Sequence, residues 1–336
     1  MVRHRALAYL ALLLAVFIWG VNFLVVKEGI NAWQGQKFMF LASRFWLACI
    51  VYALILLVRH RSFSQSFGLG FRRSAAAALV GVVLAVGYGF QTGYLAQEGN
   101  GPVKAAFLTS TTVLWAPFLA RILGQKVYPA TAIGAVLAMG GIILMEWRNL
   151  SWSLDWAHWL ALFAAVAFAV EILLVSRLAP KDQSIQWTLI SCLTVAVLMT
   201  GLGLLNDDWP VGQTGERIGA VIFTGLFATA IALGLQNWAQ AQEIRGEKII
   251  TGPRAAIIST LEPVFTTLAA FSLVIVGRGG EENVQGLPVL GCALILVGTL
   301  VSEFAAAKRT QDERAQARQA DRELDQLQAQ TRDSIP

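Results

Sequence analysis

The chain has 336 residues, of which 56% are hydrophobic and only 14% are charged, and its formal net charge is +5. Soluble domains typically carry about 25% charged residues, and the apolar residues here recur in blocks of roughly twenty, the length of a membrane-spanning helix. This composition excludes an ordinary soluble protein, and we predict an all-α integral membrane protein. The excess positive charge is attributed to loops that face an anionic lipid leaflet, not to nucleic-acid binding.

Ten apolar segments follow one another along the chain, and most connections between them are short. The first has a basic flank, but its apolar run continues to Val26 without a small-residue cleavage site. We therefore interpret it as a retained span and not as a signal peptide. The predicted spans cover residues 7–26, 38–58, 75–96, 103–122, 130–147, 156–178, 185–205, 218–240, 252–276 and 286–304.

Lys and Arg are more frequent in the loops on the side of the N-terminus than in the loops on the other side. The positive-inside rule therefore predicts that both termini are cytoplasmic, as an even number of spans requires. The expected location is a bacterial-type inner membrane. Residues 305–336 carry many charges of both signs and are predicted to form a cytoplasmic tail.

The two halves of the chain resemble each other in sequence. Residues 9–27 align with residues 159–177 without a gap, and both halves end in an apolar segment with the same spacing of two glycines. We predict one five-span repeat in residues 1–150 and a second in 151–304. Because five is odd, the second repeat must enter the membrane in the opposite direction. Such inverted repeats are typical of secondary transporters, which bind substrate near the midplane where the halves meet.

Three ionisable residues lie deep in the predicted spans: Arg44, Glu171 and Glu262. A charged side chain at the centre of a bilayer costs about 2.5–3.5 kcal/mol on insertion scales, so each is expected to face the bundle interior. Glu171 and Glu262 are candidates for contact with protons or substrate. The alternative for both is an ion pair or hydrogen bond that holds helices together. Arg44 lies nearer a helix end, where its long side chain can reach the interface, and a structural role is favoured.

Pro117 and Pro263 are predicted to kink the fourth and ninth spans, because proline lacks a backbone N–H and crowds the preceding turn. Glu262 directly precedes Pro263. Membrane proteins that change conformation during transport typically place a bent helix with a polar group beside their substrate. The alternative is a tilted packing helix whose Glu262 caps a neighbour. The hydroxyls of residues 109–112 could satisfy carbonyls that Pro117 frees, or could line a cavity.

Amide and aromatic side chains within the spans form a further set of candidates. An apolar cavity with a few polar groups suits amphipathic solutes, although some of these side chains could be plain packing. The predicted substrate-binding residues are Trp19, Asn22, Tyr88, Gln91, Tyr94, Thr111, Trp115, Gln236, Trp238 and Glu262.

Five sequence stretches occur in a characteristic order: Trp19–Phe23, Arg44, Gln91–Pro117, Thr224–Gln240 and Leu261–Val264. Together they resemble the drug/metabolite transporter superfamily, in its ten-helix group built from two EamA-type domains. The resemblance implies ten transmembrane helices as two inverted five-helix repeats around a central cavity. Helices one, three, four, six, eight and nine would surround the cavity, and five and ten would pack outside. It also implies amino acids, metabolites or drug-like solutes as substrates, usually exported.

No sequence pattern supports an enzyme. His4, His60 and His158 lie at ends or in loops without a Cys or Asp cluster, and the chain has no phosphate-binding Gly-Lys-Ser/Thr loop. We therefore expect no metal and no cofactor. The predicted function is a secondary transporter that moves a small organic solute by alternating access, acts as a monomer in lipid, and has protons as a candidate coupling ion. The alternatives are a membrane scaffold or partner protein, or a membrane enzyme.

Overall fold

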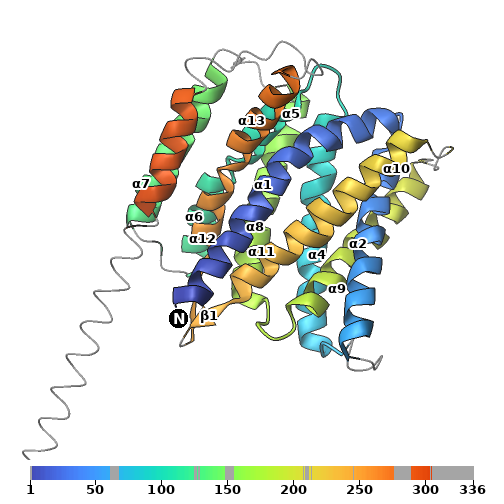
Figure 1. The fold of residues 1–336 in the computed structure, drawn as a ribbon, viewed down its shortest axis with the longest axis horizontal. Coiled ribbons are helices and arrows are strands. Elements are labelled where there is room, and N and C mark those ends of the chain that lie inside the picture. Colours follow the sequence, from blue (N-terminus) through green and yellow to red (C-terminus); the bar gives the residue numbers. More distant parts are fainter. Residues whose placement is uncertain are drawn as a thin grey trace, which may run out of the picture.

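The computed structural model describes residues 2–60, 68–124, 127, 129–147, 155–206, 208, 212, 214–244, 246–275, 289–302 and 304. The predicted charged tail, residues 305–336, lies outside this set. The described chain is a bundle of helices that lie side by side (Figure 1). A two-stranded hairpin, β1–β2, connects α11 to α12.

Eight helical segments of the described chain are long and apolar enough to cross a membrane. Two shorter apolar helices, Pro129–Met145 and Val289–Ser302, coincide with the predicted fifth and tenth spans. The protein is thus an all-α multi-pass membrane protein. Its labelled elements are α1 (Val2–Ala32), α2 (Lys37–His60), α4 (Phe71–Leu95), α5 (Pro102–Thr109), α6 (Thr112–Ile122), α7 (Pro129–Glu146), α8 (Trp156–Leu178), α9 (Ser184–Leu205), α10 (Gly215–Ile222), η2 (Phe223–Ile231), α11 (Ala232–Ala241), β1 (Glu243–Ile244), β2 (Glu247–Lys248), α12 (Gly252–Ser259) and α13 (Glu262–Ile275).

Two of the long segments each consist of two helices separated by a two-residue turn. Helix α5 ends after eight residues and α6 begins at Thr112; helix α12 also ends after eight residues and α13 begins at Glu262. We call the turn Ser110–Thr111 the first break and the turn Thr260–Leu261 the second break. A proline in the first turn of α5 and of α12 suits a helix start, because the N–H that it lacks would have no intrahelical acceptor.

The two breaks differ in their relation to proline. The second break lies directly before Pro263, whose missing N–H deprives the Ser259 carbonyl of its usual helical donor. The N–H groups of Thr260 and Leu261 instead donate to carbonyls three residues earlier, at 3.1 Å each.

The fourth span is interrupted at the first break and not at Pro117, where a kink is expected from the sequence. Helix α6 continues through Pro117, and the first break lies earlier in the chain. There the hydroxyls of Thr109, Thr111 and Thr112 donate to carbonyls three or four residues before them. Such side-chain bonds compete with the helical backbone pattern, so the threonines, and not the proline, mark this break.

A third irregularity is the π-helical segment η2, in the middle of the segment that joins α10 to α11. Two of its carbonyl oxygens accept hydrogen bonds from side chains on other helices. Trp19 Nε1 of α1 donates to the Ala228 oxygen at 2.9 Å, and the Tyr52 hydroxyl of α2 donates to the Ala230 oxygen at 2.5 Å. The η2 segment is therefore held from two sides.

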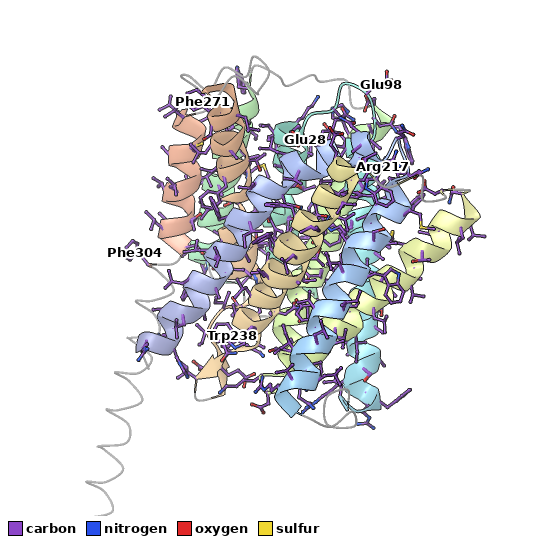
Figure 2. All side chains as sticks on the ribbon, turned by 45° about the vertical axis from the view of Figure 1, so that its right-hand side comes forward. Glu28, Glu98, Arg217, Trp238, Phe271 and Phe304 are labelled. Carbon is purple, nitrogen blue, oxygen red and sulfur yellow. The ribbon has the colours of Figure 1, made fainter. Side chains whose placement is uncertain are left out.

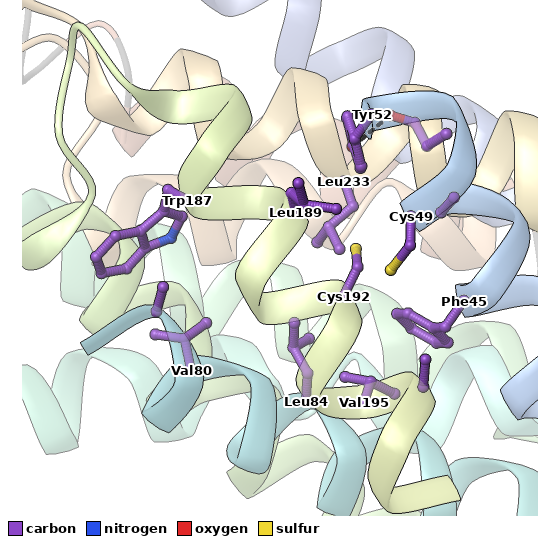
Figure 3. Packing of buried hydrophobic residues seen from close by; sticks show 14 of the residues in the cluster. Phe45, Cys49, Tyr52, Val80, Leu84, Trp187, Leu189, Cys192, Val195 and Leu233 are labelled. Carbon is purple, nitrogen blue, oxygen red and sulfur yellow. Dashed lines mark hydrogen bonds between the residues drawn. The ribbon is translucent and has the colours of Figure 1, made fainter. Parts of the chain in front are cut away.

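A large apolar cluster joins α2, α4 and α9 (Figure 3). Phe45, Leu84 and Val195 lie in it, together with Cys49 and Cys192, which are buried and free. The two cysteines act as small apolar side chains. This cluster fixes α2, α4 and α9 against one another and forms one wall of the bundle.

Helix α7 and the C-terminal helix Val289–Ser302 pack on each other at one edge of the bundle (Figure 1). A Cβ on Gly134 would lie 2.6 Å from the Gly298 oxygen, and a Cβ on Gly298 would lie 2.7 Å from the Gly134 oxygen. Gly141 and Gly291 make the same reciprocal contact, at 2.5 Å in both directions. The two helices are therefore antiparallel and touch backbone to backbone, as small residues permit in membrane proteins.

Helix α8, which carries Glu171, has a fixed start. The Asp155 carboxylate accepts a hydrogen bond from the His158 N–H at 3.1 Å and caps the helix. The same bond holds the pKa of Asp155 below its usual value, because it stabilises the charged form of the carboxyl group.

Candidate functional site

A cavity lies in the bundle interior between α1, α4, α5–α6, α8, α11 and α12–α13. These elements correspond to the predicted spans one, three, four, six, eight and nine, and none of the lining residues comes from α7 or the C-terminal helix. The cavity volume is about 70 Å³, enough for several water molecules. The lining residues are Trp19, Asn22, Phe23, Val26, Leu84, Tyr88, Gln91, Leu95, Thr109, Ser110, Thr112, Phe168, Glu171, Ile172, Leu233, Gln236, Ala256, Ser259 and Glu262.

Glu171 enters the cavity wall from α8 and is held by amide groups of α11. It is almost fully buried, and Gln236 Nε2 donates to its two carboxylate oxygens at 3.2 and 3.5 Å. Gln240, one turn further along α11, donates to the Ile172 carbonyl at 3.4 Å and so ties the same face of α11 to α8. A buried carboxyl group requires such hydrogen bonds to offset its desolvation.

Glu262 is the first residue of α13 and directly follows the second break. Its carboxylate has no hydrogen-bond partner among the described residues, in contrast to Glu171. Its backbone is fixed, because the Thr266 hydroxyl lies 2.9 Å from both the Glu262 carbonyl and the Gly20 carbonyl of α1 and can donate to either. A Cβ on Gly20 would lie 3.0 Å from the Glu262 oxygen and 2.5 Å from the Phe265 Cβ, so α1 and α13 meet backbone to backbone here.

Two further polar atoms of the cavity wall lack partners within the described chain. Asn22 Oδ1 and the Ser110 hydroxyl are buried and make no hydrogen bond there. Leaving a buried polar atom unpaired costs about 1–3 kcal/mol, so a polar group bound in the cavity would stabilise these two atoms. Thr112, by contrast, is satisfied: its hydroxyl donates to the Thr109 carbonyl at 2.7 Å or to the Ala165 carbonyl of α8 at 2.9 Å.

Arg44 lies behind the cavity wall. It is 1% exposed, and its Nε donates to the Thr229 hydroxyl of η2 at 3.0 Å. Its guanidinium lies 5.0 Å from the centre of the Tyr88 ring and 5.4 Å from that of Phe45, distances typical of cation–π contacts. Tyr88 itself lines the cavity, so one aromatic ring separates this cation from the interior space.

Seven predicted site residues come together around the cavity: Trp19, Asn22, Tyr88, Gln91, Glu171, Gln236 and Glu262. Four others, Tyr94, Thr111, Trp115 and Trp238, do not line it, and Arg44 contacts only a ring of its wall.

Trp115 is 38% exposed, because α6 turns Thr112, Val113 and Ala116 inward and the opposite face outward. The Thr111 hydroxyl donates a hydrogen bond to the Leu108 carbonyl at the first break. Tyr94 is fully buried nearer the end of α4, with its ring 6.0 Å from that of His158.

Trp238 lies at the end of the bundle near β1, opposite the end that carries Glu28 and Glu98 (Figure 2). It is half-buried beside a cluster formed largely by α1, α7 and α12 and is thus displaced along the bundle from the cavity.

Several lining residues were missed in the sequence, and helical spacing could have found most of them. Phe23 and Val26 follow Trp19 at intervals of four and seven residues, and Phe168 precedes Glu171 by three. Residues at these intervals share one helix face. The same spacing does not identify Ser110, because the first break interrupts the helix there.

Comparison with known proteins decides the family. Residues 6–147 and 155–304 each match the EamA-like transporter family. The chain belongs to this family. An uncharacterized transporter of Archaeoglobus fulgidus is 26% identical over 299 residues, covering 88% of this chain and 86% of the relative. The uncharacterized inner membrane transporter YedA of Escherichia coli is 29% identical over 226 residues, covering 66% of this chain and 71% of YedA.

The fold is also found in a solved structure. A crystal structure of a protein with 19% sequence identity superposes with a TM-score of 0.67 and covers 90% of this chain and 98% of its own. The family and the names of the relatives support a membrane transporter and imply a small molecule as its substrate.

Proposed function

We propose that the chain is a secondary transporter that exports a small organic solute across an inner membrane by alternating access. The observation that carries this proposal is the cavity between elements of both halves, with Glu262 at a backbone break in its wall. Discontinuous helices beside a central cavity are the usual setting of substrate sites in secondary transporters. The site residues are those of the cavity wall, with Glu171 and Glu262 as the groups that bind protons.

The architecture that we propose is ten spans in two inverted repeats, residues 1–150 and 151–304, with both termini in the cytoplasm. Support comes from the two separate matches to one family and from the equal lengths of α5 and α12 before their breaks. The reciprocal glycine contacts between α7 and the C-terminal helix add to it, because a pseudo-two-fold axis relates pairs of contacts in this way. Since each half supplies part of the cavity, one chain suffices, and we propose a monomer.

The test is solute flux in proteoliposomes that contain the purified chain. Counterflow of labelled amino acids, amines and small organic acids, measured with and without a pH gradient, should reveal one class that moves faster than in protein-free vesicles. A well-folded chain that moves none of them would indicate a scaffold or partner protein and would contradict the proposal.

A further inference from the structure

We propose that the solute carries an ammonium group and no carboxylate, and that the Glu262 carboxylate binds its ammonium. This inference rests on the proposed function in taking the cavity as the solute site. It goes further in assigning the charge of the solute, which family membership leaves open.

The charges around the cavity carry the argument. Among the residues that the structure describes, the cavity lining includes two carboxyl groups, Glu171 and Glu262, and no Lys, Arg or His. The cation behind the wall is Arg44, over the outer face of the Tyr88 ring. One guanidinium against two carboxylates leaves one negative charge when both acids are ionised. A net charge buried in a helix bundle is costly, so the site is favourable with one added positive charge, either a proton or an ammonium group.

The two acids are not equivalent in this respect. Glu171 already accepts hydrogen bonds from Gln236, whereas the Glu262 carboxylate has no such partner among the described residues. Asn22 Oδ1 and the Ser110 hydroxyl, on the same cavity, also lack partners there. An ammonium group offers three donors and no acceptor, which complements this surplus of acceptors.

The rest of the wall suits the remainder of such a solute. Trp19, Tyr88 and Phe168 present rings to the cavity, and Tyr88 and Phe168 meet edge to face at 5.2 Å. Aromatic faces attract cations and pack against apolar groups. A carboxylate on the solute would find two carboxyl groups in the wall and no cationic donor. The cavity therefore selects an amine with an apolar body over an amino acid or an organic acid.

Protons must compete with the amine for Glu262. Of the elements packed against α13, α1 carries its ionisable side chains, such as Tyr9 and Lys27, towards its two ends, and α5 carries only Lys104. Across the cavity lie Glu171 on α8 and Tyr88 on α4, with Arg44 behind the latter. A protonated Glu262 offers no charge to an ammonium group, so an amine must displace the proton from any protonated Glu262, and amine binding weakens as the pH falls.

The test compares three probes that share one ring and one chain length: phenethylamine, phenylalanine and 3-phenylpropionate. Binding is measured by calorimetry on the full-length chain in nanodiscs at several pH values. We expect phenethylamine to bind at least tenfold more tightly than the other two, and its affinity to fall as the pH is lowered. Equal or tighter binding of phenylalanine or 3-phenylpropionate would overturn the proposal.

Variants assign the binding to one carboxylate. Glu262→Gln should weaken phenethylamine binding at least tenfold and reduce its pH dependence. Glu262→Asp keeps the charge and should bind within tenfold of the native chain, which guards against a folding defect. Glu28→Gln removes an exposed carboxylate at the end of α1 and should change nothing. Phenethylamine binding that survives Glu262→Gln unchanged would refute the assignment.

Flux measurements keep the two proposals apart. If phenethylamine binds through Glu262 but no solute crosses the membrane, the amine site stands and the transport proposal fails. If the proteoliposomes move an organic acid while phenethylamine does not bind, transport stands and the amine site is wrong.

Discussion

The first and second breaks share a backbone design but differ in their chemistry. In each, an eight-residue helix leads into a two-residue turn, and a new helix begins inside the bundle. The first residue of the new helix is Thr112 in one case and Glu262 in the other. Thr112 is fully satisfied by carbonyl oxygens, whereas the Glu262 carboxylate faces the cavity without a partner in the described chain.

The difference extends to how each break is attached to its neighbour. At the first break, Thr112 itself bonds to α8. At the second, the bond to α1 is made one turn later, by Thr266, which leaves the side chain at the break unused. A carboxylate at the start of α13 also benefits from the partial positive charge of a helix N-terminus. The comparison teaches that the side chain at the first break is used to bind a neighbouring helix, whereas the side chain at the second break places a carboxylate in the cavity.

Replacing Glu262 should have the largest effect. Glu262→Gln removes the charge, and Glu262→Thr makes the second break resemble the first. Hydrogen bonds to charged groups contribute about 1.5–3 kcal/mol, so solute flux should fall roughly tenfold to a hundredfold. The melting temperature should stay close to that of the native chain. Native flux from either well-folded variant would show that the two breaks do not differ in function.

A substitution in the contact between α1 and α13, next to the second break, should have the second-largest effect. Gly20→Val forces a side chain against Phe265 and the Glu262 carbonyl, and overpacking of this kind costs about 1–3 kcal/mol. Both the melting temperature and the flux should fall. Gly201→Val is the matched control, because a Cβ on Gly201 meets nothing within 4 Å; equal losses in both variants would contradict the reading of this contact.

Thr112→Val should affect stability more than transport. It removes the hydroxyl that bonds to Ala165 and Thr109 while keeping the shape of the side chain. Interhelical hydrogen bonds in membranes contribute about 0.6 kcal/mol on average and up to about 1.7. Thermal denaturation should therefore show a small loss, and flux per folded molecule should remain. A loss of flux without a loss of stability would give the first break a role in solute binding.

Replacing the two prolines should affect flux unequally. Pro117→Ala restores a hydrogen bond within α6 and should leave flux unchanged, because the first break does not depend on it. Pro263→Ala offers a donor to the Ser259 carbonyl, favours closure of the second break, and should lower flux several-fold. Hydrogen exchange at residues 259–263 would show the closure. Identical behaviour of the two variants would mean that proline is not what distinguishes the breaks.

Much of this molecule is readable from its sequence, because apolar length identifies the helices and helical spacing extends a few correct residues to a whole face. Trp19 and Asn22 lead to Phe23 and Val26 in this way. The breaks are different. Four consecutive hydroxyl residues at 109–112 give no indication of which ones line the cavity, and one of the hydrogen bonds that orient them is made to α8. Trp115 was misplaced for the same reason, since the rotation of α6 is set by contacts far along the chain.

The η2 segment likewise sets which way the side chains of the following helix, α11, point. Moving a helical hydrogen bond by one residue rotates everything downstream by about 100°, so the direction in which Gln236 points is set by bond spacing several residues before it. Its meeting with Glu171 depends on wide turns that Trp19 and Tyr52 hold open. An ordinary α-helix of the same sequence would put a different residue of α11 in front of that acid.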